Sequence, residues 1–167
     1  FWFAEVEGRK VVAAADCTGH GVPGALLSLI GASLFQETVV ERRVLDAAGI
    51  LEALRDGFDQ TLNKGDGEQH RDGMNVSLVV IDDASGTLEH AGAFGPAYLL
   101  RDGAIQEMKG DRMPIGHHEG EMRAFGSTIM EVRSGDRVFL FSDGITDQFG
   151  GPNGKKLRAA GLRQWLI

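Results

Sequence analysis

The chain has 167 residues, of which 43% are hydrophobic and 25% charged, and its formal net charge is −7. This length favours one domain with its own core, and the acidic balance argues against a nucleic acid or an anionic membrane surface as partner, because both bind basic surfaces. We find no signal peptide and expect no membrane-spanning segment, while the single cysteine excludes an internal disulfide and favours a reducing, cytoplasmic compartment.

The first third of the chain is predicted to form two strands followed by two helices. Residues 1–6 and 10–16 flank a glycine turn, which indicates an antiparallel hairpin. An apolar-periodic run from 22 to about 45 predicts a long helix, and a second helix over 46–63 follows, which Asp46 can cap. The apolar residues that fall near one face of the first helix are Leu26, Leu29, Ile30, Leu34 and Val40. Those that recur every four residues on the second are Ile50, Leu54, Phe58 and Leu62.

The rest of the chain changes from a helical to a strand-like period. A polar loop is expected at 64–72, and a last helix begins at about Leu157. The strands predicted between them are 75–81, 87–93, 97–101, 104–108, 125–132 and 137–142. Because consecutive strands joined by tight turns cannot be parallel, the sequence predicts an antiparallel α+β fold with its helices grouped.

Two apolar strands end on an aspartate beside a glycine turn. The first leads into Asp16, and the second leads into Asp143. Carboxylate oxygens at exposed strand ends are suitable ligands for a hard cation. We therefore predict that the two strand ends meet in one metal site, with the alternative that each aspartate only caps its turn.

The neighbours of these aspartates are assigned supporting roles. Cys17 has an acid beside it, which raises a thiol pKa, so we interpret its side chain as packing rather than as a nucleophile. His20, in a glycine turn, is interpreted as a residue that holds the loop together by hydrogen bonds or supports the metal ligands without binding an ion. Asp147 can cap or hydrogen-bond the second loop, and the pair His117-His118 is interpreted as loop.

The stretch Gly19-His20-Gly21-Val22-Pro23-Gly24 also matches the G-x-G-x-x-G pattern of dinucleotide-binding domains. Two features count against that alternative. Asp16 would place a negative charge beside the pyrophosphate, and the preceding strand is predicted to belong to a hairpin rather than to a parallel unit.

Four sequence blocks together resemble the PPM-type, metal-dependent Ser/Thr protein phosphatases. The chain is most similar to the bacterial branch typified by the stage II sporulation phosphatase and the regulators of the stress sigma-factor cascade. The blocks are VVAAADCTGHGVPGALLSLIG, DGMNVSLVVID with LEHAGAFGPAYLLRDG, GDRMPIG, and GDRVFLFSDGITDQFGGPNGKK. The resemblance implies two packed antiparallel sheets flanked by helices, formed by residues 1–167 as a single PPM-type domain truncated at both ends.

The resemblance also implies a mechanism. Two Mn²⁺ or Mg²⁺ ions would lie between the sheets, with Asp16 bridging both, the backbone carbonyl of Cys17 facing one, and Asp143 binding the other. A metal-bridging hydroxide would attack the phosphorus of a phosphoserine or phosphothreonine. The residues assigned to the surrounding loops are Gly19, His20, Gly21, Gly144 and Asp147. In relatives the substrate is often a small anti-sigma antagonist, and an N-terminal sensor or repeat domain precedes the phosphatase domain.

The chain departs from the family pattern at several positions. Two further metal-binding aspartates of the family fall before Phe1 and after Ile167, so we expect residues 1–167 alone to bind metal weakly and to turn over little. Asn75 stands where many relatives have Asp. The stretch 93–96 reads Ala-Phe-Gly-Pro, whereas the corresponding stretch in relatives more commonly carries polar Asn or His residues. The alternative function is therefore a catalytically inactive signalling module of the same fold. Relatives use the helices after the first motif as a switch, and helices 22–45 and 46–63 are the candidates here.

Overall fold

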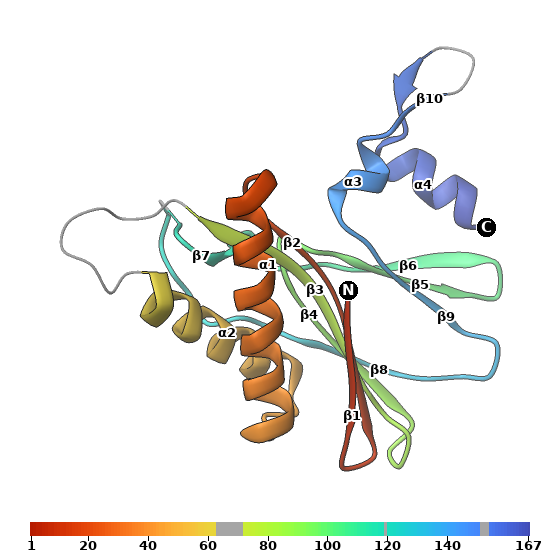
Figure 1. Cartoon of the computed structure of the whole chain (residues 1–167). Helices are drawn as coiled ribbons and strands as arrows, with labels where there is room; N and C mark the ends of the chain where they lie inside the picture. Colours follow the sequence, from red (N-terminus) through yellow and green to blue (C-terminus); the bar gives the residue numbers. More distant parts are fainter. Residues whose placement is uncertain (63–71, 119, 151–153) are drawn as a thin grey trace.

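The computed structural model describes residues 1–62, 72–118, 120–150 and 154–167. The loop predicted at 64–72 lies outside the described residues, apart from Asp72. Two sheets form the centre of the molecule, with two helices on one side and the C-terminal helices on the other (Figure 1). The predicted α+β class with packed antiparallel sheets and flanking helices is confirmed.

The larger sheet has six strands in the order β1-β2-β3-β4-β8, and β7 also pairs with β3. Every one of these pairings is antiparallel, and the predicted N-terminal hairpin is confirmed by the register that sets Trp2 opposite Ala13. The bounds are β1 Trp2–Val6, β2 Arg9–Cys17, β3 Gly73–Asp82, β4 Thr87–Ala93, β7 Ile115–Gly116 and β8 Thr128–Glu131.

Two helices cover one face of this sheet. Helix α1 (Gly21–Phe35) continues as a π-helix, η1 (Gln36–Glu41), and α2 (Ala47–Leu62) follows. The predicted helix to about Leu45 was therefore too long, since the helix ends at Glu41 and Arg43 has a positive φ of 56°. The predicted cap on α2 is confirmed, because the Gly49 N–H donates to Asp46 Oδ1 at 2.7 Å.

The buried face of α1 agrees with the prediction only in part, since Ile30 and Leu34 pack partly buried against the core. The residues that pack inward are Gly24, Leu27, Gly31 and Phe35. Leu26 and Leu29, expected near the buried face, are 55% and 67% exposed. The cause is the close approach of the helix backbone to the sheet, since a Cβ on Gly31 would lie 3.1 Å from Met74 Sδ.

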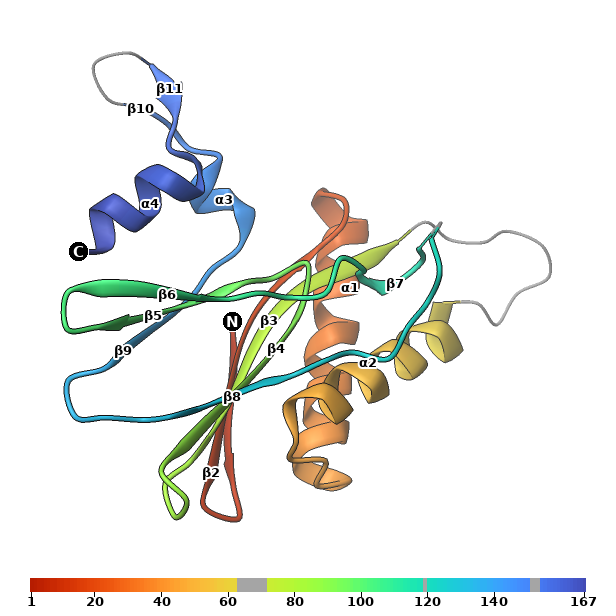
Figure 2. The same cartoon turned by 180° about the vertical axis from the view of Figure 1, so that it is seen from behind.

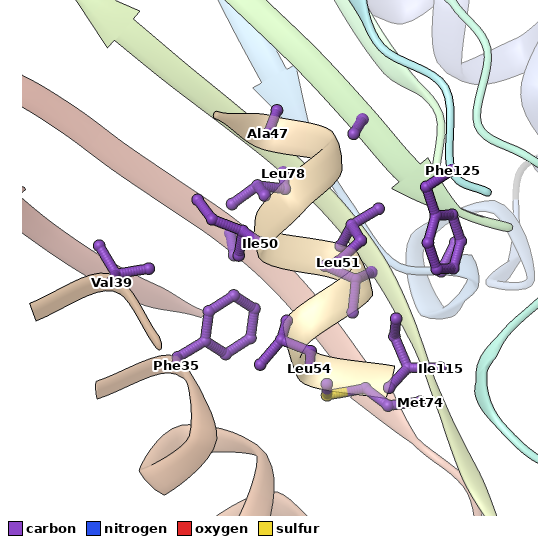
Figure 3. Packing of buried hydrophobic residues seen from close by; sticks show 14 of the residues in the cluster. Phe35, Val39, Ala47, Ile50, Leu51, Leu54, Met74, Leu78, Ile115 and Phe125 are labelled. Atoms are coloured by element: carbon purple, nitrogen blue, oxygen red, sulfur yellow. The ribbon is translucent and has the colours of Figure 1, made fainter. Parts of the chain in front are cut away.

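The main core lies between these helices and the larger sheet. Figure 3 shows part of this cluster, in which Phe35 precedes η1, Ile50, Leu51 and Leu54 come from α2, and Leu78 comes from β3. The predicted period on α2 is confirmed, because Ile50, Leu54 and Phe58 are fully buried. This packing fixes α1, and with it the turn that follows β2.

The smaller sheet has three strands in the order β6-β5-β9, all antiparallel. Its bounds are β5 Ala97–Arg101, β6 Ala104–Met108 and β9 Arg137–Leu140. A second apolar cluster joins it to the larger sheet and includes Val79 and Leu88 on one side and Leu99 on the other. Figure 2 shows the two sheets from behind, with β8 in the larger sheet and β9 in the smaller.

The C-terminal segment lies beyond the smaller sheet (Figures 1 and 2). It contains α3 (Asp143–Thr146), the hairpin of β10 (Phe149–Gly150) and β11 (Lys155–Lys156), and α4 (Arg158–Leu166). Arg163 of α4 donates to the hydroxyl of Tyr98 in β5 at 3.3 Å. The molecule is thus layered as helices, sheet, sheet and helices.

By length and composition alone, the helix Gly21–Glu41 could cross a membrane, which differs from the expectation that the chain has no such segment. The packed core helices of soluble proteins meet the same criterion, and one face of this helix is buried against the sheet. The finding is weak evidence for a membrane span.

Candidate functional site

A cavity of about 530 Å³ opens where the two sheets meet. Its walls come from the end of β2, the start of β3, the loop between β4 and β5, the middle of the smaller sheet and the start of α3. The lining residues that carry polar groups or aromatic rings are Asp16, Asn75, Ser77, Phe94, Tyr98, Glu107, Phe141, Ser142, Asp143 and Thr146.

Asp16 and Asp143 both line this cavity. Asp16 is the last residue but one of β2 and is paired across the sheet with Asn75 of β3. Asp143 begins α3, directly after Ser142, whose backbone is extended. The strand predicted over 137–142 is shorter, since β9 ends at Leu140 and Asp143 belongs to α3. The end of β2 and the start of α3, which are distant in sequence, therefore contribute exposed carboxylates to one cavity, and the role of these carboxylates as metal ligands stays a prediction.

The donors on the cavity wall are oxygen atoms, which is the chemistry that Mg²⁺ and Mn²⁺ prefer. Asp16 and Asp143 supply carboxylates, and Asn75 supplies an amide oxygen. Glu107 already accepts a hydrogen bond from Arg163 at 3.1 Å. Within the described ranges no group of three or more His, Cys, Asp or Glu side chains is arranged to hold an ion. The donor type fits a divalent cation, while other oxygens must complete its shell.

The turn after β2 requires glycine at two positions. Gly19 and Gly21 have φ values of 87° and 67°, a region that other residues rarely adopt. A Cβ on Gly24 would lie 3.1 Å from the Gly19 backbone, so the first turn of α1 packs directly on this loop. The glycines of the motif therefore shape the loop beside Asp16.

Thr18, which the sequence analysis did not single out, ties this turn to β3. Its backbone N–H donates to the Gly73 carbonyl at 2.9 Å, and the Gly73 N–H donates to Thr18 Oγ1 at 3.0 Å. His20 was predicted to hold the loop together, but its exposed side chain makes no capping hydrogen bond to α1. The signal in the sequence was weak, because the partner of Thr18 lies on a distant strand.

Cys17 faces the opposite side of β2 from Asp16 and packs against the main core. Burial raises the pKa of its thiol, a hydrogen bond with Ser28 opposes this, and the charge of Asp16 adds a smaller upward contribution. The predicted direction is confirmed, although burial is the larger cause. A protonated, half-buried thiol agrees with the interpretation of Cys17 as a packing residue.

Of the remaining predicted loop residues, Asp147 lies outside the lining of the cavity. Its backbone N–H donates to the Asp143 carbonyl at 2.8 Å, and its carboxylate accepts from Lys156 Nζ at 2.7 Å. It therefore ties α3 to β11. Gly144 is the second residue of α3, and His117 and His118 also lie outside the lining.

The sequence analysis missed a buried polar pair next to the cavity. Ser77 Oγ donates to the Pro96 carbonyl at 3.0 Å and lies 3.4 Å from His90 Nε2. His90 is 1% exposed, and its Nδ1 has no hydrogen-bond partner among the described residues. Burial lowers the pKa of His90 to about 4, against a smaller opposing effect of the Gly95 backbone. The imidazole is therefore neutral at pH 7.

The dinucleotide alternative is wrong. β2 pairs antiparallel with both β1 and β3, so the glycine turn does not belong to a parallel strand–helix–strand unit. The glycines instead pack against one another, as described above.

Comparisons with known proteins agree with this fold. A family model described as Stage II sporulation protein E (SpoIIE) matches residues 7–166. The SiaA-PP2C domain of Pseudomonas aeruginosa is 26% identical with a TM-score of 0.84, and the match covers 99% of this chain and 63% of that one. A search of curated proteins found no match.

Two further structures are similar in fold alone. The PP2C phosphatase domain of SpoIIE from Bacillus subtilis, solved with a fragment of its regulatory domain, is 16% identical with a TM-score of 0.72, covering 99% of this chain and 46% of that one. The RsbU and RsbW domains of Rv1364c from Mycobacterium tuberculosis are 20% identical with a TM-score of 0.69, covering 90% and 41%. This chain spans less than two thirds of the length of each of the three structures.

Proposed function

The chain belongs to the stage II sporulation protein E family, and on that basis we propose that it hydrolyses phosphoserine or phosphothreonine on a bacterial signalling protein. The fold of the chain is that of PP2C-type phosphatase domains. The observation that carries the proposal is the single cavity lined by both Asp16, near the end of β2, and Asp143, at the start of α3.

Asp16, Asp143 and the backbone carbonyl of Cys17 are the proposed ligands of Mn²⁺ or Mg²⁺. Bound ions would supply the positive charge that activates a water molecule and neutralises the phosphoryl oxygens. The residues of the chain would fix the position of this charge. The Thr18–Gly73 hydrogen bonds hold the Asp16 turn on β3, and Asn75 lies directly across from Asp16.

The other wall of the cavity would limit access of bulk water to the phosphoryl group. Tyr98 and Phe141 pack with their ring centroids 4.8 Å apart, and both line the cavity. Arg163 fixes the hydroxyl of Tyr98 from the far side. The carboxylates thus share their cavity with a packed aromatic pair, beside which charge interactions would be stronger than in open water.

The wider setting is also a proposal. We expect a cytoplasmic domain that acts on a phosphoprotein, with a small anti-sigma antagonist as the first candidate substrate. A sensor or repeat domain N-terminal to it in the parent protein would control its activity. The SpoIIE structure contains a fragment of a regulatory domain beside its PP2C domain, and the RsbU domain occurs in one protein with an RsbW domain. This supports a regulatory partner but not its identity.

The test is hydrolysis of para-nitrophenyl phosphate by the full-length protein with Mn²⁺. Asp16→Asn and Asp143→Asn should each lower kcat by about 100-fold or more, because each removes a carboxylate that would hold an ion whose positive charge stabilises the transition state. Asp59→Asn on the exposed side of α2 is the matched control and should retain activity.

Two results would contradict the proposal. If both cavity variants keep their activity, neither Asp16 nor Asp143 is required for the reaction. A folded full-length protein without any metal-dependent activity, on this substrate and on phosphopeptides, would favour the alternative of an inactive signalling module.

A further inference from the structure

Phe94 lies at the edge of the cavity that contains Asp16 and Asp143. It belongs to the loop between β4 and β5, and 48% of it is exposed. A large apolar side chain that is both exposed and part of a functional cavity is available to contact whatever enters that cavity.

The backbone of Phe94 adopts a φ of 54°. This region is unfavourable for a bulky residue and is usually occupied by glycine. Glycine would adopt this backbone conformation with less strain than phenylalanine. The presence of phenylalanine indicates that the side chain has a use that offsets the backbone strain.

The strained conformation is fixed from both sides of the loop. The Phe94 N–H donates to the Asp111 carbonyl at 2.8 Å, and the Asp111 N–H donates to the Gly92 carbonyl at 2.7 Å. A Cβ on Gly95 would lie 2.3 Å from the Val76 carbonyl oxygen, so the loop rests directly on β3. The Phe94 ring is therefore presented by a rigid support.

The next residues of the loop are held in the same way. Ser77 Oγ donates to the Pro96 carbonyl, and the neutral His90 packs behind Ser77. Pro96 also lines the cavity. A preorganised apolar surface loses little conformational freedom when a ligand packs on it, which favours binding.

The chemistry of the lining indicates what Phe94 recognises. The described lining residues include no Lys, Arg or His, so they offer no cation to pair with an acidic side chain beside the phosphorylated residue. Besides Asp16 and Asp143, the lining includes the apolar side chains of Val76, Pro96 and Phe141. Phe94 forms a β-bridge with Val76, and Pro96 lies two residues further along the same loop. An apolar side chain is the group that this surface can desolvate without leaving a polar group unpaired.

We propose that Phe94 is a specificity-determining residue, which packs against an apolar side chain adjacent to the phosphorylated serine or threonine of the substrate protein. This inference rests on the proposed phosphatase function. It concerns the selection of substrate and assigns Phe94 no part in the chemical step.

The experiment compares two phosphoserine peptides that differ only in the residues flanking the phosphoserine, leucine in one and asparagine in the other. The full-length protein is assayed with Mn²⁺ on both peptides and on para-nitrophenyl phosphate. Phe94→Ala should lower the preference for the leucine peptide, measured as the ratio of kcat/KM values, by about tenfold. The change should be in KM, and para-nitrophenyl phosphate hydrolysis should be retained.

Three further variants separate the side chain from the backbone. Phe94→Gly relieves the positive φ and removes the ring, so it should lose selectivity as Phe94→Ala does. Phe94→Leu should restore most of the preference. Phe149→Ala removes another exposed phenylalanine, 71% exposed on β10 and outside this cavity, and should change nothing.

The outcomes distinguish the inference from the function on which it rests. An unchanged peptide ratio in Phe94→Ala, with para-nitrophenyl phosphate still hydrolysed, overturns the inference alone. Equal losses on both peptides and on para-nitrophenyl phosphate in a folded variant would show that Phe94 supports the reaction site rather than selectivity. Absence of all activity in the wild-type protein would overturn the proposed function itself.

Discussion

His90 couples the stability of the protein to pH. Its side chain shares a face of β4 with Leu88, which packs against the smaller sheet. Only 1% of it is exposed, and it stays neutral because burial lowers its pKa from 6.5 to about 4. Between these two values the unfolded chain binds a proton that the folded protein does not, so stability must rise with pH across this window.

We expect the free energy of unfolding to be constant above about pH 7 and to fall between pH 6.5 and 4, by up to about 3 kcal/mol at roughly 1.4 kcal/mol per pKa unit. Thermal unfolding at several pH values measures this. His90→Gln should flatten the dependence, and His20→Gln on the exposed turn should leave it unchanged. An equal slope in wild type and His90→Gln would exclude His90 as its source.

The Arg101–Asp136 ion pair affects the free energy of unfolding in a different pH range from His90. The guanidinium donates to both carboxylate oxygens at 2.9 and 2.6 Å, and together with the Arg133 N–H it lowers the pKa of Asp136 to about 2. The contribution of this pair is present above the ordinary aspartate pKa and is lost only as pH falls toward 2. The Arg101–Asp136 pair therefore does not contribute to the loss expected between pH 6.5 and 4.

At the scale of a single element, α1 presents an apolar face to solvent. Val22, Leu26 and Leu29 are 73%, 55% and 67% exposed, while Leu27 on the other face is 5% exposed. Contacts with the folded domain do not account for the exposed face. It is suited to the switch role expected for this helix, because a movement of α1 would be transmitted through Gly24 to the loop beside Asp16.

Leu29→Ala and Leu26→Ala should change the free energy of unfolding by no more than about 0.5 kcal/mol and should change the phosphatase activity of the full-length protein. Leu27→Ala, the buried counterpart, should destabilise by about 2–5 kcal/mol. Thermal unfolding and para-nitrophenyl phosphate turnover of the same samples provide both readouts. If activity is the same across all exposed-face variants, the switch hypothesis for α1 fails.

The predicted face of α1 was correct for Ile30 and Leu34 and wrong for Leu26 and Leu29, because hydrophobicity alone was used to find it. The helix lies close to the sheet, where Gly24 and Gly31 leave room and larger side chains do not fit. The π-helix η1 was also missed. It rotates the following residues relative to a 3.6-residue period and keeps Thr38 and Val39 buried.

Across the whole molecule, strand bounds that depend on local sequence were predicted well, and contacts between residues distant in sequence were not. The bounds of β4, β5 and β6 agree with the prediction because glycine turns mark their ends. β8 is shorter than the predicted 125–132, since only Thr128–Glu131 pairs with β4. The meeting of Asp16 and Asp143 followed from two similar strand ends, whereas Ser77, His90 and Phe94 come together only through packing that no local pattern encodes.

Metal binding is expected to stabilise the whole molecule, because the proposed ligands come from β2 of the larger sheet and from α3, which follows β9 of the smaller sheet. Mn²⁺ at ten times its Kd should raise the free energy of unfolding by about 1.4 kcal/mol. A concentration series should give a high Kd, because among the described lining residues only two carboxylates, those of Asp16 and Asp143, are not already in an ion pair. Asp16→Asn together with Asp143→Asn should abolish the shift in Tm, and Asp59→Asn should retain it. A full shift in the double variant would place the ion elsewhere.

The position of the cavity between two sheets also determines when it can form. Asp16 and Asp143 are far apart in the sequence, so forming the cavity that both line closes a very long loop of chain. Hairpins such as β1–β2 and β5–β6 form from neighbouring residues and require little loop closure. The cavity that both carboxylates line can form only when the two sheets have docked. We therefore expect the proposed site to be completed late in folding, after the local hairpins have formed.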